Sequence, residues 1–127
     1  MSPANFRKML ALGEMPTPVN KTTSVANNSN VNVASISLSA GTWVVCARVT
    51  FPNNSTGRRA IKLSTTSLDS GNPVSTVLQN PVSSAATHIS TTRCFNLTST
   101  TTVYLIAWQN SGGALSCVGD IEATRVG

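Results

Sequence analysis

The sequence of 127 residues has little charge, few aromatic side chains and a single histidine. Charged residues make up 10% of the chain, well below the roughly 25% of an average soluble domain. His88 stands among Ser, Thr and Ile, and no G-x-S-x-G elbow or phosphate-cradling glycine loop accompanies it. Because Ser-His-Asp catalysis needs a carboxylate and a nucleophile beside the histidine, we expect no enzyme activity and a surface or interface position for His88.

The cysteines are also few, and they do not form a metal-binding pattern. Cys46, Cys94 and Cys117 have no C-x-x-C spacing, and one histidine cannot complete a usual zinc site. Their odd number argues against a dense disulfide framework. One bridge, for example between Cys94 and Cys117, and three small buried side chains both remain open. Only Asp120 and Glu122 are acidic neighbours in sequence, so we expect no metal and no cofactor.

Long apolar runs and basic clusters are absent from the sequence as well. No window approaches the ~18 apolar residues of a membrane helix, and the N-terminus lacks the pattern of a signal peptide. We therefore expect synthesis in a host cytoplasm and no membrane insertion. The net charge is +5, but no basic run exceeds two residues and no aromatic side chains interleave with the basic ones. This pattern disfavours nucleic acid and favours a solvated surface or contact with an acidic protein or glycan.

What the chain does contain is a series of β-strand patterns separated by turn residues. In the stretch 41–51, one face would carry Trp43, Val45, Ala47, Val49 and Phe51. This period of two predicts a strand with a buried face. Pro52 ends the strand because it cannot donate to a ladder. We expect Trp43 in the core.

The same reasoning predicts about eight or nine short strands. The clearest are expected at 31–38, 42–51, 58–66, 88–97, 102–109 and 115–126, with weaker ones between 68 and 86. Turn signals recur every ten or so residues. The predicted fold is therefore an all-β, antiparallel β-sandwich of the jelly-roll type.

The first twenty residues differ from the rest. Phe6, Met9 and Leu10 fall at helical spacing, and a helix this short needs a partner surface. The segment 1–20 is either a tail that folds back on its own sandwich or a helical or extended anchor that docks into a larger assembly. Docking is favoured because residues rich in Pro, Asn, Thr and Ser follow immediately.

The chain then divides into three parts: the anchor 1–20, a linker 21–32 and a jelly-roll domain 33–127. Residues 20–32 are mostly Asn, Ser and Thr with isolated valines. They suit either a flexible tether or an irregular edge strand.

Four short stretches resemble a known family. They are Ala-Gly-Thr-Trp-Val-Val at 40–45, Thr-Gly-Arg-Arg at 56–59, the late strand 103–112 and the ending Ile-Glu-Ala-Thr-Arg-Val-Gly at 121–127. In order and spacing they are similar to tumour-necrosis-factor-like and complement C-one-q-like jelly rolls, especially those of bacteriophage fibre tips. The resemblance covers about residues 33–127. It implies a compact homotrimer that binds through loops or inter-subunit grooves without catalysis. The chain departs from animal members in having no Gly-x-y stalk and no acidic calcium cluster.

The strand at 102–109 is apolar on both faces, whereas one sandwich core needs only one. Its second face carries Tyr104, Ile106 and Trp108. Packing of subunits around a threefold axis would cover these side chains, and we favour this interface. The alternative is that loops of the same chain cover them.

These observations predict a phage virion structural protein of the head or tail fibre kind. Its N-terminus would bind other virion proteins, and a trimeric jelly roll would project outward. Loops at 53–58, 69–73, 80–87 and 110–114 would contact host surface glycan or protein, with Arg58, Arg59 and Asn110 as candidate contacts. One alternative is a capsid-decorating or tail-connecting protein without a receptor role. Another is a bacterial carbohydrate-binding module.

Overall fold

The protein folds into two packed antiparallel sheets in the computed structural model, which describes residues 12–71 and 76–127. Every regular element in these ranges is a β-strand. The helix expected around Phe6, Met9 and Leu10 lies outside the described residues. The strands are β1 Val19–Val25, β2 Val31–Leu38, β3 Gly41–Phe51, β4 Arg59–Ser64, β5 Val77–Gln79, β6 Thr87–Leu97, β7 Thr101–Gln109 and β8 Leu115–Arg125.

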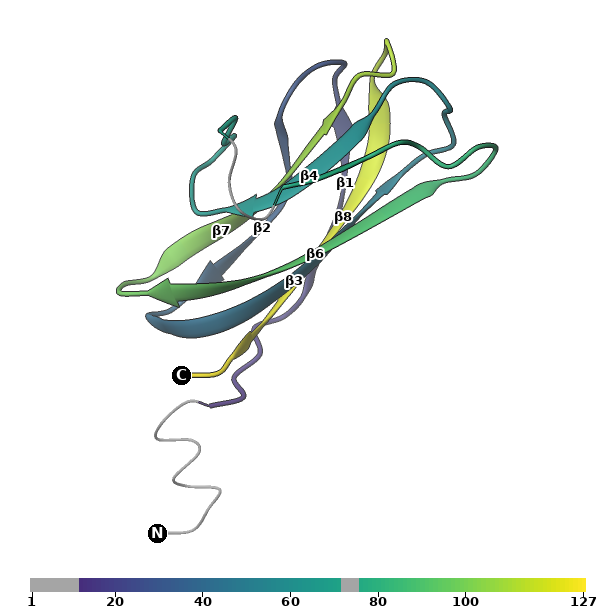
Figure 1. Ribbon diagram of the computed structural model, residues 1–127. Helices are drawn as coiled ribbons and strands as arrows, with labels where there is room; N and C mark the ends of the chain where they lie inside the picture. The colour runs from purple at the N-terminus through teal and green to yellow at the C-terminus, as the bar shows by residue number, and fades with distance from the viewer. Residues whose placement is uncertain (1–11, 72–75) are drawn as a thin grey trace, which may run out of the picture.

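The strand order identifies the architecture. One sheet has the order β1-β8-β3-β6 and the other β2-β7-β4-β5. Figure 1 shows the two layers and labels these strands apart from β5. The pairs β1/β8, β2/β7, β3/β6 and β4/β5 are all antiparallel, so the chain runs like one long hairpin rolled around a core. This is the eight-stranded jelly roll, and the predicted fold class is confirmed.

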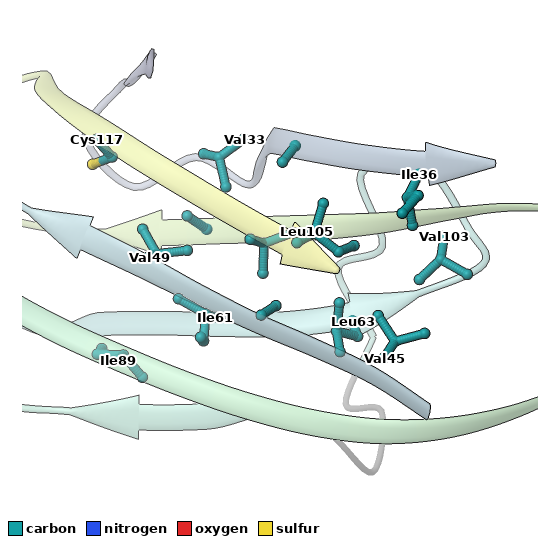
Figure 2. Packing of buried hydrophobic residues seen from close by; sticks show 14 of the residues in the cluster. Val33, Ile36, Val45, Val49, Ile61, Leu63, Ile89, Val103, Leu105 and Cys117 are labelled. Atoms are coloured by element: carbon teal, nitrogen blue, oxygen red, sulfur yellow. The ribbon is translucent and has the colours of Figure 1, made fainter. Parts of the chain in front are cut away.

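β3 and its neighbours fill the space between the sheets. The predicted alternation along β3 is confirmed, since Trp43, Val45, Val49 and Phe51 are all 0% exposed. The strand ends at Phe51, directly before the proline. Side chains from both sheets point toward one another in Figure 2, among them Val45 and Val49 from β3 and Leu63 from β4. The indole of Trp43 also donates to Ser39 O at 2.8 Å, which satisfies its only polar group.

Of the two alternatives for residues 20–32, the structure forms the edge strand. β1 pairs with β8 from Val19↔Ile121 to Val25↔Leu115. An edge strand tolerates the polar residues of β1 because one of its edges and one of its faces meet solvent. The wider division into anchor, linker and domain stays a prediction.

The weakly patterned region between 68 and 86 contributes little regular structure. β5 has only three residues, and it pairs with β4 over Arg59↔Gln79 to Ile61↔Val77. β4 itself is shorter than the predicted 58–66. At this same edge of the sandwich, Arg93 of β6 donates to Leu63 O of β4 at 3.0 Å and so links the two sheets.

Candidate functional site

Three loops are joined at one end of the sandwich, opposite the C-terminus (Figure 1). They are the β1–β2 loop 26–30, the β3–β4 loop 52–58 and the β7–β8 loop 110–114, and together we call them the loop end. The β5–β6 connection, which includes 80–86, reaches the same end in Figure 1. Three of the predicted contact loops, 53–58, 80–87 and 110–114, thus lie at the same end of the sandwich, together with the β1–β2 loop.

Gln109, the last residue of β7, holds two of these loops. Its side chain is 0% exposed and its Nε2 donates to Val25 O at 2.9 Å and to Gly113 O at 2.6 Å. Its Oε1 accepts from Ser111 N at 2.7 Å. Its backbone oxygen accepts from Asn28 N at 2.7 Å. Because the Nε2 and the Oε1 of this buried side chain are both hydrogen-bonded to backbone groups, Gln109 fixes the geometry of the loops around it.

Arg59 fixes the β3–β4 loop from beneath, which corrects its predicted role as a ligand contact. The residue is 0% exposed, and its guanidinium donates to the backbone oxygens of Asn54, Thr56 and Arg58 at 2.8–3.0 Å. It also lies 5.9 Å from the ring centroid of Phe51. Burial lowers the pKa of this guanidinium from its ordinary value. Arg59 therefore organises the loop and does not reach a ligand.

Arg58 and Asn110, the other two predicted contacts, are exposed and lie together. Arg58 N donates to Asn110 Oδ1 at 2.5 Å, and Asn110 N donates to Arg58 O at 3.3 Å. Gly57 makes this approach possible. Its φ is +76°, and a Cβ there would lie 2.3 Å from Asn110 O.

The β1–β2 loop was missed by sequence reasoning, although it belongs to the loop end. Asn27 Oδ1 accepts from Gly112 N at 2.8 Å, which joins this loop to the β7–β8 turn. The signal in the sequence was the cluster of asparagines at 27, 28 and 30, which alone does not tell a tether from a turn. The described part of the predicted contact loop 69–73, residues 69–71, does not join the loop end. Its residues 72 and 73 lie outside the described residues.

That β4–β5 segment instead lies over the outer face of the second sheet. Asn32 of β2 donates to Ser67 Oγ at 2.8 Å, and Lys62 of β4 donates to Gly71 O at 2.9 Å. These two residues flank Ile106 of β7 in the ladder, and Ile106 is 0% exposed. Ile106 is therefore buried within its own chain and needs no second copy to cover it.

Tyr104 and Trp108 remain half-buried on the same outer face. Ala60 of β4 pairs with Trp108 on one side and with Leu78 of β5 on the other. Leu78 is 54% exposed. A hollow of about 220 Å³ lies beside this row and is lined by both Ile106 and Trp108. Part of the predicted interface thus stays open to solvent in the single chain.

The outer face of the first sheet carries a groove of about 380 Å³ with a mixed polar and apolar lining. Arg48 and Asp120 form an ion pair across it at 3.6 Å, and Asn20 donates to the same carboxylate. Glu122 also lines the groove, on the same side of β8 as Asp120.

The cysteines and the acidic residues form no metal site in the parts of the chain that the structure describes. Cys46, Cys94 and Cys117 are free thiols there, and no group of three or more His, Cys, Asp or Glu could hold a metal. Cys117 is buried, Cys46 is half-buried and Cys94 is exposed, so the interpretation of three buried cysteines holds only for Cys117. Among the described residues, no helix has the length and apolarity needed to cross a bilayer.

No family model matches the chain, and no curated protein matches it either. Its fold is similar to part of two solved structures of infectious bursal disease virus. The structure of the Gx strain aligns with a TM-score of 0.57 and 13% identity over 90% of this chain and 34% of the other. The VP2 subviral particle aligns with a TM-score of 0.59 and 14% identity over 90% of this chain and 33% of the other. This chain thus spans about a third of those proteins, and the likeness is one of fold.

Proposed function

We propose that the protein is a structural protein of a virion, in which its jelly roll projects from the particle and its loop end meets the host surface. The observation that carries this proposal is the opposite placement of the two ends of the sandwich. Gly13 N donates to Arg125 O, and Arg125 N donates to Glu14 O, each at 2.9 Å. The entry of the N-terminal segment is thus held beside the end of β8, away from the loop end.

The segment that would dock into the particle carries suitable side chains. Leu12 is 38% exposed and Met15 is 59% exposed, although both are apolar. Both side chains are therefore accessible to another protein. With residues 1–20 bound to other virion proteins, the loop end faces outward. The fold likeness to virus structures supports a virion role in general, and the bacteriophage fibre type is our narrower proposal.

The experiment compares the incorporation of the full chain and a variant lacking residues 1–11 into particles. The shortened chain keeps all eight strands, so we expect it to fold with an unchanged thermal midpoint and to be absent from purified particles. A double variant, Leu12→Ser with Met15→Ser, should reduce incorporation in the same direction. Incorporation of the folded, shortened chain at the level of the full chain would refute the anchor.

A homotrimer completes the proposal, with Tyr104 and Trp108 facing a neighbouring copy. A capsid-decorating or tail-connecting role would need the anchor and the trimer but no host contact. Failure of the purified protein to adsorb to host cells, combined with normal incorporation, would favour that role.

A carbohydrate-binding module is the second candidate function, and the groove beside Arg48 and Asp120 favours it. Its volume of about 380 Å³ lies in the usual range of small-ligand sites. If this function is correct, Arg48→Ala removes glycan binding and variants of the loop end do not.

A further inference from the structure

Each of the three loops contains one asparagine whose side-chain oxygen faces a backbone N–H. Asn27 Oδ1 accepts from Gly112 N at 2.8 Å, Asn54 Oδ1 accepts from Thr56 N at 2.9 Å, and Asn110 Oδ1 accepts from Arg58 N at 2.5 Å. A backbone N–H can only donate, so each side-chain oxygen must be the atom that faces it. The orientation of each amide is therefore settled by the loop itself.

The consequence is that the three Nδ2 groups have no partner among the residues that the structure describes. Each carries two N–H donors. Asn27 and Asn110 are exposed, and Asn54 is half-buried. The side-chain acceptors are turned toward the backbone, and the donors are left for solvent or a ligand.

The three loops of the loop end carry positive charge and no negative charge. Arg58 is exposed and forms no ion pair with any described residue, and Arg59 lies buried beneath it without a carboxylate partner. Residues 26–30, 52–58 and 110–114 contain no Asp or Glu. The acidic residues lie elsewhere: Glu14 pairs with Arg125, Asp69 bonds to Ser64 and Gly71, Asp120 pairs with Arg48, and Glu122 lines the groove.

We propose that the loop end binds an anionic, oxygen-rich glycan, whose carboxylate or phosphate groups accept hydrogen bonds from Asn27, Asn54, Asn110 and Arg58. This inference rests on the proposed host-contact role of the loop end. A surface of donors with positive charge is complementary to an anion, and hydrogen bonds to an ionised acceptor are about twice as strong as neutral ones. The donors are pre-positioned because their oxygens are already bound, which reduces the ordering cost of binding. The two sources of the anion, carboxylated sugars and phosphate-bearing polymers, share this chemistry.

The test measures binding of the purified full chain to three immobilised probes at equal density. They are an oligogalacturonate, a glycerol-phosphate oligomer and a neutral malto-oligosaccharide. We expect binding to at least one anionic probe, at least about tenfold tighter than to the neutral probe, and weaker binding as salt is raised. The anionic probe that binds identifies the source of the charge.

The decisive variants are Asn27→Asp, Asn54→Asp and Asn110→Asp. Aspartate keeps the oxygen that accepts the backbone N–H and replaces the outward NH₂ with a negatively charged oxygen. Each change should lower affinity for the anionic probe about tenfold while the thermal midpoint is kept. Arg58→Gln should weaken binding in the same direction without touching the loop contacts.

Asn96→Asp provides the matched control. Asn96 lies at the other end of β6, where its Oδ1 accepts from Thr42 Oγ1 at 3.3 Å, so the variant makes the same charge change away from the loop end. It should bind like the wild type. Equal binding of neutral and anionic probes, no binding to any probe, or unchanged binding by all loop-end variants would overturn the inference. The proposed virion role is judged separately by incorporation into particles, which this panel does not measure.

Discussion

Gly57 occupies a position in the loop end where no side chain fits. Its positive φ and the position of Asn110 O, 2.3 Å from where a Cβ would be, leave room only for hydrogen. An alanine at this position would have to adopt a backbone conformation that L-residues avoid and push the β7–β8 turn away.

Gly57→Ala should therefore lower the free energy of unfolding by roughly 1–3 kcal/mol, as measured by urea denaturation. Gly113→Ala is the matched control in the neighbouring loop, because nothing lies within 4 Å of its added Cβ and its φ lies outside the left-handed region. We expect the control to stay within about 0.5 kcal/mol of the wild type. Equal losses for the two variants would contradict the close-approach argument.

The buried thiol of Cys117 makes the free energy of unfolding depend on pH in the alkaline range. Burial raises the pKa of its thiol from 9.0 to about 11, and the charge of Arg59 opposes the shift only in part. The folded state therefore disfavours the thiolate that the unfolded chain forms near pH 9. The stabilisation is complete below pH 9 and is lost as pH rises toward about 11.

The measurement compares urea denaturation at pH 8 and near pH 11 for the wild type and for Cys117→Val, which has a similar volume and no titrating group. The wild type should lose up to roughly 2–3 kcal/mol more than the variant over this range. Cys94→Val on the exposed side of β6 is the control and should keep the wild-type difference. Identical pH dependence in the wild type and Cys117→Val would show that the thiol contributes nothing.

At the scale of elements, β1 carries an uncompensated polar group. Thr23 stands opposite Cys117 in the ladder, and its buried Oγ1 has no hydrogen-bond partner among the described residues. Burying a hydroxyl without a partner costs free energy, and removing it while keeping the shape recovers that cost.

Thr23→Val should consequently raise the urea midpoint, with a gain of about 0.5–1.5 kcal/mol in the free energy of unfolding. Thr22→Val, one residue away on the exposed side of the same strand, is the matched control and should change little. A lower midpoint for Thr23→Val would mean that the hydroxyl stabilises β1.

The elements also explain which parts of the molecule the sequence could predict. β3 and β7 were predictable because their alternation and turn residues are local signals. β1 was not settled, because its stability comes from pairing with β8 almost a hundred residues later. The loop end was half predicted for the same reason. Arg58 and Asn110 were named, but the docking of the 26–30 loop depends on a contact between distant segments. Arg59 turns inward to bond backbone oxygens of its own loop, and the residue types alone do not distinguish this from an exposed arginine.

The outer face of the β2-β7-β4-β5 sheet is only partly covered by its own chain. The 65–71 segment accounts for Ile106, whose burial is complete. It leaves the row of Leu78, Ala60 and Trp108 partly exposed, whereas Tyr104 lies opposite Ser64, on the other side of Ile106 along β7. Apolar side chains that stay exposed on an outer sheet face favour contact with another copy. A threefold arrangement around this row would also orient three loop ends in the same direction, which strengthens weak binding through multivalency.

Light scattering of the purified full chain tests this assembly. The wild type should have three times the mass of one chain, and Tyr104→Arg with Trp108→Arg should have the mass of a monomer, since two charges would be buried at the interface without partners. Ile106 must be left unchanged, because its substitution would disturb the fold itself. Val44→Arg on the outer face of the first sheet is the control for an added surface charge and should remain a trimer. If the double variant has the same mass as the wild type while circular dichroism shows that it is folded, Tyr104 and Trp108 do not form the interface.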